Sequence, residues 1–158
     1  MKLTFDDRGY LKPYDLIEID WDTFVEKFVT SFPNSFTRNF IFTAFNTFTI
    51  SIQSLLKQKV EVWINGSFTT LKENPNDIDI VLFVPNSLMS KQIQEFVLKN
   101  QRDNESKIDA YLVEVFSEDY RSYIFYETDQ KYWLSQFGTT SPNRRKERFV
   151  KGIIKITI

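Results

Sequence analysis

VEVWINGSFTTLKENPNDIDIVLFV, residues 60–84, holds two apolar runs separated by a polar segment. Residues 60–64 and residues 77–84 are short apolar runs, which are typical of strands in a folded core. Gly66-Ser67 follows the first run and predicts a turn. The polar residues that come next predict a loop. The stretch therefore predicts two strands joined by a turn and a loop.

Two helices are predicted before this stretch. A short one is expected from about residue 21 to residue 31, with Asp20 or Asp22 as its N-cap, because aspartate accepts hydrogen bonds from the free amides of a first turn. Ser35 can cap a second helix that runs to about Lys57, since apolar residues recur there at steps of three and four. The inner stripe of this helix is expected to comprise Phe36, Phe40, Ala44, Phe48, Ile52 and Leu55, widened by Ile41, Phe45 and Leu56.

Helices and strands alternate in the rest of the chain. The expected elements are a helix over residues 87–99, a strand over 108–116, a helix from Ser117 to about Phe137 and a closing strand over 152–158. The 158 residues suffice for one domain with a hydrophobic core. We therefore expect a single domain over residues 1–158. Its mainly helical part spans residues 1–58, and its sheet and C-terminal elements span residues 59–158.

Composition excludes several classes of chemistry. The chain has no cysteine and no histidine, which rules out disulfides, thiolate nucleophiles, histidine general bases and zinc sites built from these residues. Any metal must be bound through oxygen, which favours Mg²⁺, Mn²⁺ or Ca²⁺. The formal net charge is −1, so contact with a polyanion must come from a local patch.

The chain shows no targeting or membrane signal. Residues 1–7 lack the apolar core of a signal peptide, and no stretch is long and apolar enough to span a bilayer. We therefore expect a cytoplasmic protein that does not associate with membranes.

The turn and the second strand carry residues that suit a nucleotide and a metal ion. Gly66 lets the backbone approach a ligand closely, while amides at a helix start and the Ser67 hydroxyl attract phosphate. Asp77 and Asp79 lie two residues apart on a predicted strand, so both carboxylates share one face and the apolar residues between and after them share the other. Two carboxylates so close repel each other unless a divalent cation lies beside them.

A third acid could complete this cluster. Asp109 lies on the next predicted strand, and the three acids converge if that strand neighbours the one with Asp77 and Asp79. Such a cluster can hold two Mg²⁺ ions, one at the β- and γ-phosphates and one at the attacking hydroxyl, for in-line displacement at the α-phosphorus. Glu114 and Glu118 are alternative third acids.

Gly66-Ser67, a gap of nine residues and Asp77-x-Asp79 resemble the signature of the DNA polymerase beta-like nucleotidyltransferase superfamily. Within it, the chain is similar to the small, stand-alone bacterial minimal nucleotidyltransferases. The form of the motif around Asn65 and Pro75 resembles an uncharacterised domain-of-unknown-function branch of that group. The resemblance is strong over residues 60–85 and weaker elsewhere.

The resemblance implies a fold and a set of ligands. The fold would be α+β, with a small mixed β-sheet backed by helices after a helical N-terminal third. The substrate would be an NTP or dNTP and the cofactor Mg²⁺ or Mn²⁺. Gly66 and Ser67 would bind the nucleotide, with Ser67 at its phosphates. Asp77, Asp79 and Asp109 would bind the metal and act in catalysis.

The activity implied is transfer of a nucleoside monophosphate to a protein hydroxyl, an RNA end or an oligonucleotide. Small enzymes of this superfamily often serve bacterial toxin–antitoxin or antiphage systems, where the acceptor is encoded nearby. The alternative is a non-catalytic, nucleotide-binding module that acts as an antitoxin-like partner. A metal-dependent phosphate hydrolase is a third reading, which no residue favours. The sequence gives no indication of the oligomeric state.

Two weaker signals accompany the motif. Basic residues that form either a solvated face or a local contact with phosphate or nucleic acid are Lys72, Lys131 and the run Arg144-Arg145-Lys146. Aromatic residues that either pack in the core or stack on a base are Tyr123, Tyr126, Tyr132 and Trp133.

Overall fold

The two apolar runs of residues 60–84 pair with each other as antiparallel strands. In the computed structural model, which describes residues 3–158, β4 (Glu61–Asn65) and β5 (Ile78–Pro85) are joined by a 3₁₀ turn (Ser67–Thr69) and a loop. Their register sets Asn65 opposite Asp79. The predicted strands and turn are confirmed, and the turn lies beside the second acid of the motif.

Five strands form a mixed sheet in the order β3-β7-β4-β5-β6. β3 (Leu16–Glu18) runs parallel to β7 (Ile153–Thr157), and β6 (Ile108–Val115) runs parallel to β5, whereas β4 is antiparallel to both of its neighbours. β1 (Thr4–Phe5) and β2 (Leu11–Lys12) form a separate antiparallel pair. The N-terminal part thus contributes β3 as an edge strand of the main sheet, in addition to its helices.

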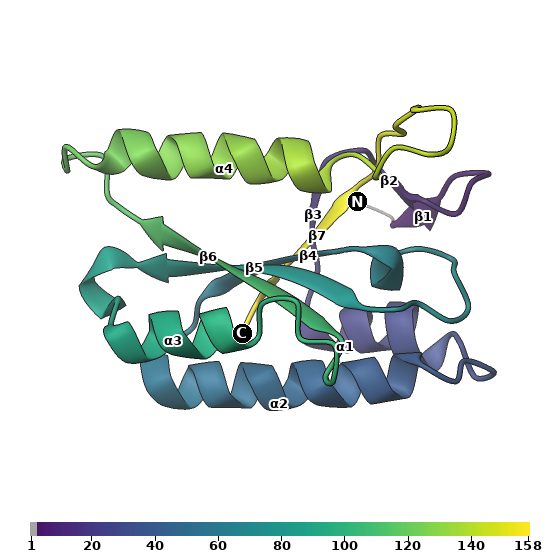
Figure 1. Cartoon of the computed structure of the whole chain (residues 1–158), viewed down its shortest axis with the longest axis horizontal. Coiled ribbons are helices and arrows are strands. Elements are labelled where there is room, and N and C mark those ends of the chain that lie inside the picture. The colour runs from purple at the N-terminus through teal and green to yellow at the C-terminus, as the bar shows by residue number, and fades with distance from the viewer. Residues whose placement is uncertain (1–2) are drawn as a thin grey trace.

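Helices cover both faces of this sheet, which confirms the α+β fold (Figure 1). One face carries α1 (Trp21–Val25), a π-helical turn (Glu26–Thr30), α2 (Arg38–Leu56) and α3 (Lys91–Lys99), and the other carries α4 (Tyr123–Phe137). Side chains of β5 alternate between the faces. Ile78, Ile80 and Leu82 pack toward α1, α2 and α3, while Val81 and Phe83 pack toward α4. Within residues 3–158, no helix is long and apolar enough to cross a bilayer.

The helix boundaries confirm some predictions and correct others. The Asp20 carboxylate accepts a hydrogen bond from the Thr23 amide (2.7 Å), as expected of the N-cap of α1. The helix predicted to reach residue 31 is α1 followed by the π-helical turn. α3 and α4 begin at Lys91 and Tyr123, later than predicted, because a 3₁₀ turn (Asn86–Leu88) and two hydrogen-bonded turns occupy the chain before them.

The buried stripe of α2 differs from the predicted one. The helix begins at Arg38, although Ser35 Oγ still accepts a hydrogen bond from the Arg38 amide (3.1 Å). The prediction was wrong for Phe36 and Phe40, which are 90% and 55% exposed. Phe36 precedes the helix, and Phe40 lies about 100° around the axis from Ile41, which is buried. The buried stripe consists of Ile41, Phe45, Phe48, Ile52 and Leu56.

Arg38 is buried inside the apolar layer at the start of α2, with 1% of its surface exposed. Its guanidinium lies 3.6 Å from the centre of the Phe32 ring. Burial lowers the pKa of Arg38 to about 10, which leaves it charged at neutral pH. The guanidinium donates hydrogen bonds of 2.6–2.8 Å to the carbonyls of Phe28, Phe68, Thr70 and Lys72. These bonds tie α2 and the π-helical turn to the loop that follows β4.

Replacing Arg38 with alanine should destabilise the fold by roughly 3–5 kcal/mol, because buried carbonyls lose a charged donor. Arg38→Lys should recover only part of this loss, since one ammonium cannot reach four acceptors. Urea unfolding measures both changes. Arg121→Ala, at an exposed arginine, is the control and should change stability by less than about 0.5 kcal/mol. A loss below about 1 kcal/mol in Arg38→Ala would contradict the structural role given to this side chain.

Candidate active site

Asp79 and the Gly66-Ser67 turn meet because β4 and β5 are paired neighbours. Asn65 is the last residue of β4, and its buried side chain holds the turn in place. Its Oδ1 accepts a hydrogen bond from the Gly66 amide (2.6 Å), and its Nδ2 donates to the carbonyl of Phe137 at the end of α4. The turn, the second strand and the end of α4 are therefore held together at one point.

Two features require a glycine at position 66: the backbone conformation and the position of the Asp79 carboxylate. Its φ angle is +85°, a conformation that glycine adopts without strain. A Cβ atom at this position would collide with the Asp79 carboxylate. The glycine of the motif thus makes room for an acid of the same motif, in addition to any close approach of a ligand.

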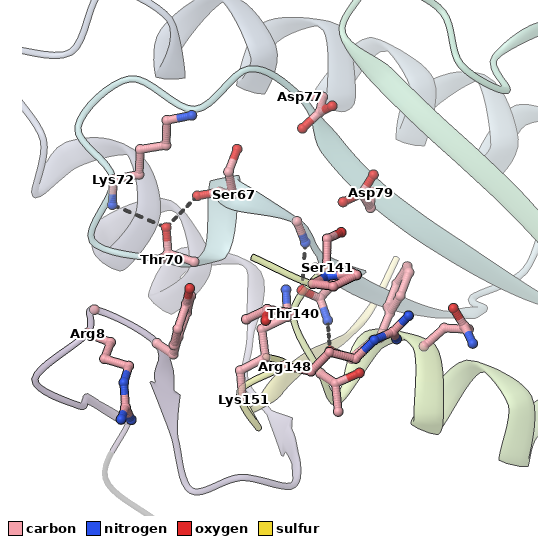
Figure 2. Close-up of a pocket in the computed structure, with 18 of the residues that line it drawn as sticks. Arg8, Ser67, Thr70, Lys72, Asp77, Asp79, Thr140, Ser141, Arg148 and Lys151 are labelled. Carbon is pink, nitrogen blue, oxygen red and sulfur yellow. Dashed lines mark hydrogen bonds between the residues drawn. The ribbon is translucent and has the colours of Figure 1, made fainter. Parts of the chain in front are cut away.

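A cavity of about 1150 Å³ opens over these residues. It lies between residues 66–72, the turn that joins β1 to β2, the end of α4, and residues 139–151. Figure 2 shows Asp77 and Asp79 on one side of this pocket and Lys151 on the other. Side chains from segments far apart in the sequence therefore converge on the predicted motif.

Charges of both signs line the pocket. The acids are Asp7, Asp77 and Asp79, and the cations are Arg8, Lys72, Arg102, Arg148 and Lys151. The hydroxyl of Ser67 also faces the pocket and accepts a hydrogen bond from the Asn76 amide (3.3 Å). Such a lining suits a ligand that combines phosphate groups with a metal cation.

The pKa values of both acids of the motif are raised, so their charged forms are disfavoured in the folded chain. Burial, together with the charges of Asp77 and Asp109, raises the pKa of Asp79 to about 6, while Lys151 acts in the opposite direction. Asp77 is exposed as a residue, but its carboxylate is partly withdrawn from water. This withdrawal and the charge of Asp109 raise the pKa of Asp77, against the effect of Lys72. A cation beside the pair would relieve both carboxylates.

Asp109 is next to this pair but outside the pocket lining. The parallel pairing of β5 and β6 sets Asp109 opposite Asp79. The prediction that the strand of Asp109 neighbours the strand of Asp79 is therefore confirmed. Its carboxylate, however, accepts hydrogen bonds of 2.9 Å from the Arg102 amide and from the Tyr111 hydroxyl. Within residues 3–158, no three acidic side chains lie close enough together to hold a metal ion. The structure thus brings Asp77 and Asp79 into the pocket and leaves Asp109 engaged beside them.

Neither alternative third acid approaches the pair. Glu114 is opposite Val84, five residues further along the strand than Asp109, so its side chain points to the other face of the sheet. There it accepts a hydrogen bond from the Asn86 side chain. Glu118 is exposed in the connection between β6 and α4. Of the three candidates, only Asp109 lies close enough for its charge to act on Asp77 and Asp79.

The structure also sorts the weaker signals of the sequence. Lys72 lines the pocket, whereas Lys131 does not. Tyr132 lines it with 54% of its surface exposed. Trp133 also lines the pocket and packs against Tyr111, with ring centres 4.5 Å apart.

Two arginines that line the pocket lie outside the motifs of the sequence. Arg8 and Arg148 lie in segments without a motif, and only the folded chain brings them to the same cavity. Lys151 closes the basic segment near the C-terminus, but its approach to Asp79 depends on the pairing of β7 with β4.

Asp77 and Asp79 fit a hard divalent cation such as Mg²⁺ or Mn²⁺. Proteins commonly hold Mg²⁺ through one or two carboxylates and leave the other positions to water and substrate phosphates. The two raised pKa values mark carboxylates whose charge lacks compensation. Asp109 does not line the pocket, and each of its carboxylate oxygens already accepts one hydrogen bond, from the Arg102 amide or the Tyr111 hydroxyl.

Gly66→Ala should destabilise the protein by roughly 1–3 kcal/mol, because alanine is strained at this φ angle and its Cβ displaces the Asp79 carboxylate. Adding Asp79→Ala to Gly66→Ala should cost less than the sum of the single changes, since the collision is then removed. Gly9→Ala is the matched control, because Gly9 also has a positive φ angle but adjoins Leu71. Urea unfolding of the single and double variants measures the coupling. Additive losses for Gly66 and Asp79 would contradict the contact.

Comparison with known proteins gives a family without a known activity. Residues 3–157 match the protein-family model described as "Family of unknown function (DUF6932)". No curated protein matches the chain, and no solved structure matches it. The resemblance to the nucleotidyltransferase superfamily therefore stays a prediction. The family match spans every element from β1 to β7 and all residues that line the pocket, so this chain belongs to the family of unknown function DUF6932.

Proposed function

We propose that this chain is a metal-dependent nucleotidyltransferase, which moves a nucleoside monophosphate from an NTP or dNTP to an acceptor hydroxyl. The observation that carries the proposal is the position of Asp77, Asp79 and the Gly66-Ser67 turn in one pocket. A metal ion suits the acids, and a triphosphate suits the hydroxyl and cations around them. The same pocket has space for a second reactant.

Each side chain has a role in the proposed reaction. Ser67 and Lys72 contact the phosphates, and Asp77 and Asp79 hold Mg²⁺ or Mn²⁺. The bound cation would neutralise negative charge on the phosphates and on the attacking oxygen. The acceptor oxygen forms a bond to the α-phosphorus, and the bond from the α-phosphorus to its bridging oxygen breaks. Pyrophosphate leaves with the electron pair, and the hydroxyl proton passes to a pocket carboxylate or to water.

A non-catalytic nucleotide-binding module is the second candidate. One observation favours it: both oxygens of Asp109 accept hydrogen bonds from the protein. If Asp109 never leaves these partners, only two acids remain for the metal. Nucleotide could then bind without transfer, as expected for an antitoxin-like partner. A catalytic centre with three acids, by contrast, would need the Asp109 carboxylate to turn toward the pair.

Asp77→Asn and Asp79→Asn should each lower turnover by roughly 10²-fold or more, because the cation loses a ligand. The full chain is incubated with each α-labelled NTP and dNTP plus Mg²⁺ or Mn²⁺, and labelled protein, oligomer and pyrophosphate are separated. Asp129→Asn, at an exposed aspartate of α4, should keep wild-type activity. Turnover that survives in Asp77→Asn and Asp79→Asn would overturn the proposal. Nucleotide binding without turnover in the wild type would support the non-catalytic module.

The same acids make stability depend on pH in the absence of metal. The pKa of Asp79 is about 6 in the folded chain, above the ordinary 3.8, so between these values the folded state binds more protons than the unfolded state. Stability should therefore fall as pH rises from about 4.5 to 7.5, by roughly 1–2 kcal/mol from this group, and Asp77 adds a change of the same sign.

Asp79→Asn should lose most of this decline and be at least as stable as the wild type at pH 7.5. Urea unfolding in a chelator at both pH values measures the change, with Asp129→Asn as the control that keeps the wild-type pH dependence. If Asp79→Asn is the less stable protein at pH 7.5, Asp79 is an ordinary capping or paired aspartate and the idea of stored repulsion fails.

A further inference from the structure

Residues 139–150 form a basic hairpin between α4 and β7 (Figure 1). Residues 139–142 and Arg148 of this hairpin line the pocket. Thr139 and Val150 form an antiparallel bridge at its base, and the Thr140 amide donates to the Phe149 carbonyl (2.9 Å). At its tip, the Asn143 side chain accepts hydrogen bonds from the amides of Arg145 (2.8 Å) and Glu147 (3.0 Å). The tip is thus held in one conformation by its own residues.

Aromatic contacts join this hairpin to the turn between β1 and β2. The rings of Tyr10 and Phe149 stack with centres 6.3 Å apart. The Arg8 guanidinium lies 4.4 Å from the centre of the Phe149 ring. Figure 2 shows Arg8 and Arg148 on the same side of the pocket, across from Asp77. The hairpin and the turn therefore form one continuous rim.

Positive charge is concentrated on the hairpin part of this rim, whereas the turn carries Asp6 and Asp7 beside Arg8. Exposed cations on the hairpin are Arg144, Arg145, Lys146 and Arg148. Within residues 3–158, neither these four cations nor Arg8 forms an ion pair. The one acid of the hairpin, Glu147, accepts a hydrogen bond from the Asn143 side chain (2.8 Å). In a chain of net charge −1, this local excess of cations attracts an anionic partner.

We propose that the basic hairpin binds the phosphate backbone of a single-stranded nucleic acid whose terminal nucleotide enters the pocket. The proposal deepens the proposed function by naming the acceptor, since the terminal hydroxyl of the strand would receive the nucleoside monophosphate. The hairpin contacts the backbone outside the pocket, while Asp77 and Asp79 act at the strand end inside it.

The chemistry of the rim favours nucleic acid over an acidic protein. Three of the four hairpin cations are arginines, whose planar guanidinium groups pair well with phosphate oxygens. Tyr132 exposes its ring in the same pocket, where a base can stack on it. A single strand is required because the acids lie within the pocket, and a base-paired end keeps its terminal nucleotide stacked in the duplex.

The test measures binding separately from transfer. Fluorescence anisotropy follows a labelled single-stranded RNA of about 20 nucleotides, the DNA of the same sequence and the matching duplex, with the full chain in a chelator and without nucleotide. The combined change Arg144→Ala, Arg145→Ala and Lys146→Ala is compared with the combined change Lys59→Ala, Lys91→Ala and Lys99→Ala. The second set removes the same charge from exposed residues outside the pocket lining.

The hairpin variant should bind single strands roughly tenfold or more weakly at low salt, and the slope of log affinity against log salt should fall by about 2. The control variant should bind as the wild type does, and the duplex should bind more weakly than the single strands. Tyr132→Ala should weaken binding roughly tenfold without changing the salt slope. Phe125→Ala, at an exposed ring of α4 outside the pocket lining, should not.

Equal binding by the hairpin and control variants would overturn the proposal. Two results together would also overturn it: a polyglutamate peptide displaces the RNA at equal charge concentration, and Tyr132→Ala does not weaken RNA binding. These results would assign the rim to an acidic protein. Single-strand binding without any nucleotidyl transfer would support the surface and count against the proposed function. Transfer to another acceptor, with single-strand binding unchanged in the hairpin variant, would support the proposed function and count against the nucleic-acid surface.

Discussion

The buried guanidinium of Arg38 is the interaction on which the geometry of the pocket depends. A charge withdrawn from water is tolerated only when its donors find acceptors. Three of the four carbonyl acceptors belong to Phe68, Thr70 and Lys72, within the segment that carries Ser67 and follows β4. If this segment took another conformation, the buried guanidinium would keep only the Phe28 carbonyl as an acceptor. The hydrogen bonds to Arg38 thereby hold the loop between β4 and β5 in one conformation. A binding site for phosphate needs such a preorganised backbone.

The core in turn supports an arrangement of acids that is unfavourable by itself. Ile78 and Ile80 are fully buried, and each contributes roughly 1.5–3 kcal/mol to the register of β5. The repulsion between Asp77 and Asp79 is of the order of 1–3 kcal/mol at the dielectric of a partly exposed site. Burial of the apolar face therefore outweighs the repulsion on the polar face, and the strand cannot turn to separate the acids. This balance between a stable core and a strained site is common where a protein binds ligands.

The features that could be predicted from the sequence are those set by neighbours along the chain. The alternation of residues 78–84 predicted both faces of β5, because the period of a strand is local. The prediction failed at Phe40, because α2 is apolar on more than one side and its pattern alone did not specify which side meets the sheet. The role of Arg38 could not be predicted, since its acceptors come from two distant segments. The register of Asp109 followed from adjacent strands, but not its hydrogen bond to the Arg102 amide.

The separation of charges in the pocket bears on the kind of ligand that it suits. Burial raises the pKa of Asp79 to about 6 and lowers the pKa of Lys151 to about 8, so each charge gains from a ligand of opposite sign. A bare metal ion would gain at Asp77 and Asp79 but would be repelled by Lys151 and its neighbours. A bare phosphate would gain at the lysine and be repelled by the acids. A nucleotide that arrives with its divalent cation carries charges of both signs. Its cation can bind at Asp77 and Asp79 while its phosphates approach Lys151, so that both sets of charges are compensated.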